Sequence, residues 1–367
     1  MNCRKLFRRG LPLFLVFMII IVIVGVIRSF KLPDMGRQPV VGVVLVGSRM
    51  DKGWNENHFN GISEACNEQG CKILVRENVM EEELPLSKAV EGLVDDGADV
   101  VFLTSFGYGQ YSDSLARRYS SVAFFSVSGQ GTERNCNTYF ARLYQARYLA
   151  GIVAGCESRT GILGYVAAMP NAQTNRGINA YALGMRRANP KARLIVRFTG
   201  NWDNEEKERE SVALLKQRGV DVITYHEDKP YAVREAEARG MFSVGYNSVH
   251  EQYSERFLTA ALYDWKVIYG RVLEDYLSGR TNMSRNYWID MSGGGVRLHR
   301  LSPLVRGSTI SLLEQEESRF TNNWDVFSGR IYDNEGTLRC ADDERISDQE
   351  LFTGMEWFAE GVEIYEQ

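Results

Sequence analysis

The apolar residues of this chain fall into short uncharged runs that alternate with stretches of helical periodicity. Residues 40–46 (VVGVVLV) carry no charge, and such a run is typical of a strand buried on both faces of a parallel sheet. A loop containing glycine follows at residues 47–53, and from Asn55 the apolar side chains recur every three or four positions. This strand, loop and helix predict the opening of a βαβ unit, around which we expect the rest of the chain to be organised.

The same alternation continues to about residue 248. Further strands are predicted at residues 71–77, 98–104, 122–127, 138–142, 161–168, 192–198, 220–225 and 241–245. The helices between them are predicted at residues 86–96, 112–119, 144–155, 175–188, 206–218 and 232–239. Two comparable series of βα units predict an α/β fold of two doubly wound, Rossmann-like lobes with a hinge and an interlobe cleft.

The last part of the chain is predicted to complete both lobes. We expect a long helix at residues 258–277, a helix at 314–322, a strand-like stretch at 326–332 and a closing helix at 349–357. Lobe 1 is predicted at about residues 39–145 with part of 250–285, and lobe 2 at about 155–248 with part of 286–367. The two lobes together make a ligand-binding domain at residues 39–367. In open α/β sheets ligands bind beyond the carboxyl ends of the strands, so the cleft is the expected site.

Residues 1–30 form a separate unit with a basic tip and an apolar stretch. Residues 11–27 carry no charge, and as a helix they would span roughly 25 Å, slightly less than a hydrocarbon core of roughly 30 Å. Because positive flanks stay in the cytoplasm, we expect the rest of the chain on the other side, at the periplasmic face of an inner membrane or at the cell surface. Residues 27–30 lack the small residues of a signal-peptide cleavage site, so an uncleaved signal-anchor helix is favoured, with residues 31–38 as a linker.

Charge and cysteine content narrow the function classes. The formal net charge is −4, and no basic block follows residue 9, so a nucleic-acid partner is excluded. The five cysteines beyond the apolar stretch are an odd number and cannot all pair. Cys66 and Cys71 are near enough in sequence to form a disulfide, but buried free thiols are equally compatible with their positions. The disulfide state of Cys136, Cys156 and Cys340 is left open in the same way.

Several short motifs follow one another in an order found in a known protein family. They are Asp51-Lys52-Gly53-Trp54 followed by His58, TSFGY at 104–108, RLYQARYLAG at 142–151, RGINA at 176–180, GYNS at 245–248, FSG at 327–329, and MEWF at 355–358 followed by EGV at 360–362. From about residue 40 to its end the chain resembles the substrate-binding proteins of the basic membrane lipoprotein family. These are purine-binding receptors of ABC importers, with the type I periplasmic-binding-protein fold.

The resemblance implies a monomeric receptor that captures a purine base or nucleoside in the interlobe cleft and presents it to an ABC permease, with no cofactor and no metal. The chain departs from the family pattern at two places. Val249 stands where relatives usually have an acidic residue, and an apolar helix replaces the lipid-carrying N-terminal cysteine. The particular purine, and whether the protein serves an importer at all, therefore stay open.

Seven residues are candidate ligand contacts, all of them polar or aromatic side chains near the ends of predicted strands. They are Trp54, His58, Phe106, Tyr108, Trp202, Asp228 and Asn247. Aromatic rings from opposite lobes can stack on the two faces of a purine, although ordinary interlobe packing is the alternative. The amide of Asn247 offers a donor and an acceptor, as a purine edge requires.

Asp228 and the two histidines each have a second interpretation. Asp228 can accept hydrogen bonds from a base or a ribose, or it can cap the helix that follows Pro230. His58 can touch the ligand or brace its own loop. His226 and Asp228 are two possible metal ligands, but no third is near them in the sequence, so no metal site is predicted.

Enzyme functions find no support in the sequence. There is no G-x-S-x-G, Walker or H-E-x-x-H motif. The alternative to a transport receptor is a membrane-tethered sensory receptor that signals ligand occupancy to a chemoreceptor or a sensor kinase, and neighbouring genes would separate the two. A small-molecule hydrolase on the same fold would have to turn over its bound nucleoside.

Overall fold

The computed structural model describes residues 37–129, 131–249, 251–280, 286–322 and 324–365. The first of its two large sheets has the strand order β11-β5-β4-β3-β1-β2, and every adjacent pair is parallel. Its strands are β1 Val40–Val44, β2 Lys72–Arg76, β3 Val100–Leu103, β4 Ala123–Val127, β5 Cys136–Ala141 and β11 Asn286–Ile289. Strands β1 and β3 are buried along their whole length, because neighbours and helices cover both faces.

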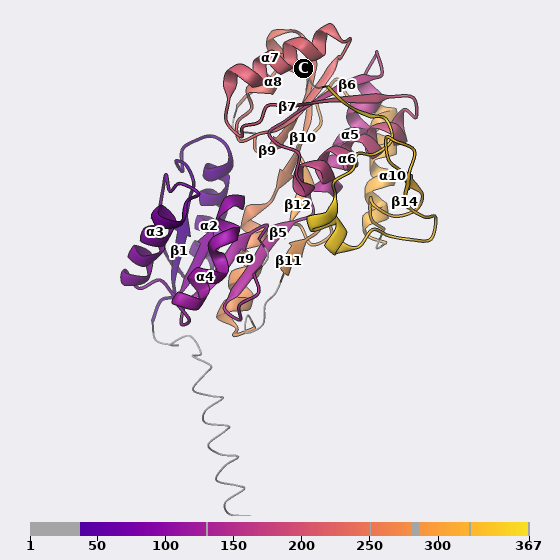
Figure 1. The fold of residues 1–367 in the computed structure, drawn as a ribbon. Helices are drawn as coiled ribbons and strands as arrows, with labels where there is room; N and C mark the ends of the chain where they lie inside the picture. The colour runs from indigo at the N-terminus through magenta and orange to yellow at the C-terminus, as the bar shows by residue number, and fades with distance from the viewer. Residues whose placement is uncertain (1–36, 130, 250, 281–285, 323, 366–367) are drawn as a thin grey trace, which may run out of the picture.

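The helices of this first sheet complete what we call the first subdomain (Figure 1). They are α2 Trp54–Gln69, α3 Glu83–Asp95, α4 Gly109–Arg118 with the 3₁₀ turn η1 Phe106–Tyr108 before it, and α9 Trp265–Leu277. Helix α9 returns from far along the chain to pack on α2. Gly61 makes this close approach possible, since a Cβ there would lie 2.4 Å from the Cβ of Trp265.

The second sheet has the order β12-β10-β9-β8-β6-β7-β15, and only β12 runs antiparallel to its neighbour. Its strands are β6 Ile162–Ala167, β7 Arg193–Phe198, β8 Val222–His226, β9 Phe242–Asn247, β10 Phe257–Tyr263, β12 Val296–Leu298 and β15 Val362–Ile364. Its helices are α5 Leu143–Glu157, α6 Ala172–Ala188, α7 Glu205–Gln217, α8 Tyr231–Ala238 and α10 Gly307–Phe320. We call this part the second subdomain.

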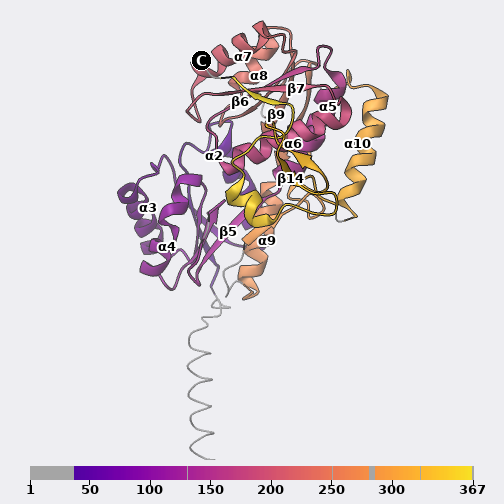
Figure 2. The same ribbon diagram turned by 45° about the vertical axis from the view of Figure 1, so that its right-hand side comes forward.

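The chain passes between the subdomains three times, from β5 to α5, from β10 to α9 and from β11 to β12. A C-terminal segment follows α10, with the hairpin β13 Ile331–Tyr332 and β14 Leu338–Cys340 and the π-helical turn η2 Glu350–Gly354. In Figures 1 and 2 the yellow helical turn of this segment lies beside α6, on the side of the second subdomain that faces the first, and the segment ends in β15, which pairs with β7. The crossings and the segment thus join both subdomains around one cleft.

The structure corrects three predicted elements. The helix predicted from residue 258 is wrong in its first part, because Phe257–Tyr263 forms the fully buried strand β10 and α9 begins at Trp265, with Asp264 accepting from the Val267 N–H. The helix predicted at 349–357 shortens to the turn Glu350–Gly354. The strand-like stretch at 326–332 reduces to Ile331–Tyr332.

Two further predictions concern the membrane anchor and the cysteines. The predicted anchor at residues 11–27 lies outside the described residues, and within the described part no helix is both long and apolar enough to cross a membrane. The five described cysteines are free, and four of them, Cys66, Cys71, Cys136 and Cys340, are buried.

Candidate functional site

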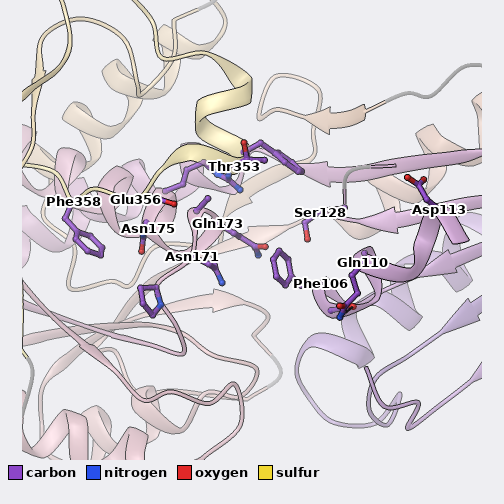
Figure 3. Close-up of a pocket in the computed structure, with 17 residues that line it drawn as sticks. Phe106, Gln110, Asp113, Ser128, Asn171, Gln173, Asn175, Thr353, Glu356 and Phe358 are labelled. Carbon is purple, nitrogen blue, oxygen red and sulfur yellow. Dashed lines mark hydrogen bonds between the residues drawn. The ribbon is translucent and has the colours of Figure 1, made fainter. Parts of the chain in front are cut away.

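A cavity of about 950 Å³ opens between the two subdomains, beyond the carboxyl ends of several strands (Figure 3). One wall comes from the first subdomain, with Phe106 after β3 and Ser128 after β4. The facing wall is the start of α6, with Asn171 and Gln173. Figure 3 shows the Gln173 side chain pointing across the cavity toward Phe106. The cleft thus lies where the βα architecture places binding sites.

The C-terminal segment forms a third wall and is fastened to α6 by polar side chains. Asn175 Nδ2 donates to the Met355 carbonyl at 3.0 Å, and the Arg176 guanidinium donates to the Leu351 carbonyl. Asn179 donates to the Trp357 carbonyl at 2.9 Å and accepts from the Ala359 N–H at 2.8 Å. These bonds satisfy backbone groups that would otherwise be buried unpaired, and they present Phe352, Thr353, Glu356 and Phe358 to the cavity.

The floor of the cleft contains a second, much smaller cavity of about 10 Å³. Gln173 and Arg176 line both cavities, and Arg147, His226 and Tyr263 line the small one. Burial and the charges of Arg147 and Arg176 hold the pKa of His226 well below its ordinary value. The imidazole is therefore neutral near neutral pH.

Of the three predicted stacking residues, Phe106 lines the large cavity, whereas Trp54 and Trp202 are not among the described residues that line either cavity. Phe106 is 54% exposed. Trp54 donates from Nε1 to the Thr104 carbonyl at 2.7 Å, and its ring lies edge-on to Tyr263 with centroids 6.2 Å apart. Trp202 lies edge-on to His226 at 6.0 Å. Each tryptophan is therefore one ring away from the small cavity, and the two come from opposite subdomains.

Asp228 occupies an acidic corner between the subdomains. Its N–H donates to the Trp202 carbonyl at 2.9 Å, and its carbonyl packs on Gly53, where a Cβ would lie 2.3 Å away. Burial raises the pKa of the Asp228 carboxyl to about 7, with further contributions from Asp51, Asp203 and Glu81 and an opposing one from Lys229. We call Asp51, Glu81, Asp203 and Asp228 the acidic corner.

No described residue donates a hydrogen bond to the carboxylate of Asp228, which is half-buried and keeps contact with solvent. In particular it does not cap the helix after Pro230, because the Ala232 N–H in the first turn of α8 donates to Glu208 at 3.0 Å. Of the two roles predicted for Asp228, the capping role is thus filled by another residue. The half-buried carboxylate of Asp228 is therefore left to water at the junction of the two subdomains.

The other three predicted residues are engaged in packing. His58 is fully buried, its Nδ1 lies 2.5 Å from Tyr269 Oη, and its ring packs on Trp265 at a tilt of 36° with the centroids 3.8 Å apart. Tyr108 is fully buried and donates to the Val79 carbonyl. Asn247 Oδ1 accepts from Trp265 Nε1 at 3.4 Å, and its carbonyl accepts from Asn57 at 3.2 Å. His58 and Tyr108 therefore sit in the core rather than on the cleft wall, which corrects their prediction as ligand contacts.

Several lining residues were not singled out from the sequence. Ser128 and Gln173 follow the ends of β4 and β6, at the same sheet edges as Phe106 and Trp202. The rule that ligands bind beyond the carboxyl ends of parallel strands could therefore have found them as well. Arg147 was noted only as part of the motif at 142–151, and His226 was considered only as a possible metal ligand. The C-terminal wall includes Glu356 and Phe358 of the MEWF motif, but the motif does not indicate a place at the cleft, because only the tertiary fold brings residues 352–358 there.

Comparison with known proteins gives one matching family and two similar relatives that are named for different ligands. The profile of a family described as "ABC transporter substrate-binding protein PnrA-like" matches residues 38–326. A purine-binding protein of Brucella abortus is 30% identical over 327 residues, covering 88% of this chain and 92% of that protein. A protein of Haloferax volcanii named for glucose binding in an ABC transporter is 33% identical over 278 residues, covering 75% of this chain and 68% of that protein.

Solved structures share the fold at low identity. A transcriptional activator of the comK gene from Bacillus halodurans superposes with a TM-score of 0.70 at 22% identity, covering 78% of this chain and 99% of that chain. An ABC transporter solute-binding protein from Aeropyrum pernix superposes with a TM-score of 0.66 at 19% identity, covering 78% of this chain and 92% of that chain. These likenesses concern the fold alone, and they agree with the predicted α/β architecture of parallel sheets.

Proposed function

This chain belongs to the Bmp family of PnrA-like ABC transporter substrate-binding proteins, and we propose that it captures a purine base or nucleoside in the cleft and presents it to an ABC permease. The family is one of solute-binding proteins and not of enzymes, so we expect the bound ligand to be released unchanged. The purine-binding relative, which the chain matches over nearly its whole length, supports a purine as the ligand.

The observation that carries the proposal is the placing of two tryptophans near a half-buried carboxylate to which no described residue donates a hydrogen bond. Trp54 and Trp202, from opposite subdomains, approach the cleft floor through Tyr263 and His226, and stacking between two rings suits a flat heterocycle. Asp228 beside Trp202 offers an acceptor to a ring N–H or an exocyclic amine. A hydrogen bond to a charged acceptor is stronger than a neutral one.

We also propose that residues 11–27 anchor the protein in a membrane as an uncleaved helix, with the binding domain outside the cytoplasm. The two subdomains would then act as lobes of a monomer, at about residues 39–145 and 155–248 with their returning elements. Ligand contacts to both lobes exist only when they are closed, so the ligand biases the equilibrium toward the closed form.

Native mass spectrometry and calorimetry of the purified full chain test the function. We expect a co-purified purine or one-to-one binding of at least one among adenine, hypoxanthine, guanosine and inosine. Glucose is the matched comparison, because another relative is named for it. Glucose binding with no purine binding would contradict the proposal.

A further inference from the structure

The floor of the cleft carries buried polar atoms that its own surroundings leave unsatisfied. His226 is 2% exposed, and neither of its ring nitrogens has a hydrogen-bond partner among the described residues. Arg147 Nε and Tyr165 Oη, also buried, are unpartnered in the same sense. A buried polar group costs free energy unless it finds a partner, so this concentration of unpaired atoms beside a cleft points to a bound group.

Hydrogen-bond donors and positive charge dominate this floor. Arg147 donates to Thr224 Oγ1 at 3.1 Å and to the Tyr225 carbonyl at 2.7 Å, and Arg176, which is 4% exposed, donates to the Leu351 carbonyl. Within the part of the chain that the structure describes, neither arginine forms an ion pair with a carboxylate. Burial lowers the pKa of Arg176 to about 10, which leaves the guanidinium charged at neutral pH.

Gly177 leaves a space next to one side of the His226 ring. A Cβ at this position would lie 3.4 Å from Tyr165 Oη and 3.5 Å from His226 Nδ1. The small cavity of about 10 Å³ has room for a single water. A water there would contact Tyr165 and His226 Nδ1 together, and the other ring nitrogen, Nε2, then stays available for the ligand.

A purine held between the two tryptophans would present one edge to this floor. Trp202 lies against His226 and Trp54 against Tyr263, and both partners line the small cavity together with Arg176. We propose that His226, Arg147, Arg176 and Gln173 bind the acceptor edge of the base, O6 and N7, so that the cleft selects 6-oxopurines over 6-aminopurines. This inference rests on the proposed function, namely that the ligand is a purine.

The chemistry of the two purine classes gives the selectivity its direction. Guanidinium N–H groups pair with O6 and N7, and the neutral imidazole does so in the tautomer that carries its hydrogen on Nε2, whereas the 6-amino group of adenine would bring a donor against these donors. The acidic corner acts in the same direction. N1 of a 6-oxopurine carries a hydrogen that can be donated to the free carboxylate of Asp228, but N1 of adenine is an acceptor.

The first test compares ligands on the unmodified full chain. Calorimetry should give a dissociation constant for inosine ten- to a hundredfold below that for adenosine, and the same order for hypoxanthine and adenine. Adenosine binding as tight as inosine, or tighter, would overturn the inference and leave the proposed function standing. If no purine or nucleoside binds, the proposed function itself fails.

Two variants ask whether the floor is the source of the selectivity. Arg176→Gln should weaken inosine binding at least tenfold and reduce the ratio between inosine and adenosine. Arg186→Gln is its matched control, because Arg186 lies on the same helix and pairs with Glu360 at the surface, with 2.7 Å between Nη2 and Oε1. The control should keep both the affinity and the ratio.

His226→Phe separates ligand binding from a structural role. The phenyl ring keeps the shape and removes both unpaired nitrogens, so the ligand-free variant should melt at the same temperature as the wild type or higher. Its affinity for inosine should still fall at least tenfold. A lower melting temperature with an unchanged affinity ratio would assign His226 to the core and overturn the inference. If the His226 variant fails to fold, Arg176→Gln decides: an unchanged ratio of inosine to adenosine affinity in that variant would overturn the inference.

Discussion

At the scale of single residues, Asp228 is the polar residue on which the proposed site depends most. Partial burial next to three other acidic residues makes the ionised carboxylate of Asp228 less favourable than in water, although Lys229 opposes the effect. Its pKa of about 7 is well above the ordinary value of about 3.9. An acid with a raised folded-state pKa binds its proton more tightly in the folded chain than in the unfolded one. The stability that it contributes is present at low pH and is lost as the pH rises from about 4 to about 7.

Asp228→Asn should therefore stabilise the ligand-free protein at high pH. Asparagine has a similar shape but cannot ionise, so the variant avoids the loss. We expect it to be more stable than the wild type at pH 8 by about 1–3 kcal/mol, less than the full shift implies because Asp228 keeps some solvent contact. The difference should nearly vanish at pH 4. Urea denaturation at both pH values measures it, and a variant less stable than the wild type at pH 8 would show that the carboxylate has a cationic partner.

The two tryptophans should carry much of the binding energy. Replacing Trp54 or Trp202 with alanine removes one stacking surface, and we expect a loss of about 1–3 kcal/mol, or roughly ten- to a hundredfold in affinity for a purine. Trp324→Ala is the control, because its ring packs on Tyr148 and Phe320 in the second subdomain. Calorimetry on the three variants decides the matter. An equal loss in the control, or none in Trp54→Ala and Trp202→Ala, would contradict a stacking role.

The residues that the sequence misplaced show where local patterns fail. His58 shares a helix face with Ile62, Ala65 and Cys66, all of which α2 buries, so its spacing already favoured the core over the loop. Tyr108 follows a strand end as Phe106 does, yet one points into the core and the other into the cleft. A strand end identifies the loop, but the direction of each side chain depends on the turn that the loop adopts.

At the scale of elements, α6 links the cleft to the C-terminal segment. Its first turn lines the cavity, where the Asn171 side chain accepts from the Thr174 N–H at 2.9 Å and fixes the helix start. Further along, Asn175, Arg176 and Asn179 bind backbone groups of residues 351–359. One helix thus positions two walls of the site.

Asn179→Ala should detach part of the third wall. The change removes bonds to the Trp357 carbonyl and the Ala359 N–H and leaves both buried groups unpaired, so we expect a loss of about 2–4 kcal/mol in unfolding free energy. The exposed Asn60 on α2 is the control, and Asn60→Ala should change stability by less than about 0.5 kcal/mol. Denaturation and limited proteolysis report both. Equal stability of the two variants would mean that the segment is held by other contacts.

The elements themselves were predictable where sequence pattern and burial agree. Uncharged runs such as Val40–Val44 and Val222–His226 form buried parallel strands as expected. The run FLTAALY has the same character, but the helical periodicity of α9 directly after it concealed the strand β10. The last elements are short, and the parallel pairing of β15 with β7, made over more than 160 residues of sequence, leaves no local trace.

At the scale of the whole molecule, two sheets joined by three crossings leave one cleft in which both subdomains can touch a ligand. We proposed above that the positively flanked apolar stretch at residues 11–27 anchors the protein in a membrane. If it is an uncleaved anchor, the full chain should fractionate with membranes and keep its first residues, because residues 27–30 offer no cleavage site. N-terminal sequencing checks this, and a mature chain that begins near Phe30 would contradict it.

The central claim is that a purine is held between the two subdomains, and a crystal structure of the full chain with inosine tests it most directly. Our account predicts the base between Trp54 and Trp202, with O6 and N7 toward Arg176 and His226, the N1 hydrogen toward Asp228, and the two walls of the cleft drawn together around it. Inosine bound elsewhere on the molecule, or a cleft still empty in crystals grown with saturating purine, would contradict the account.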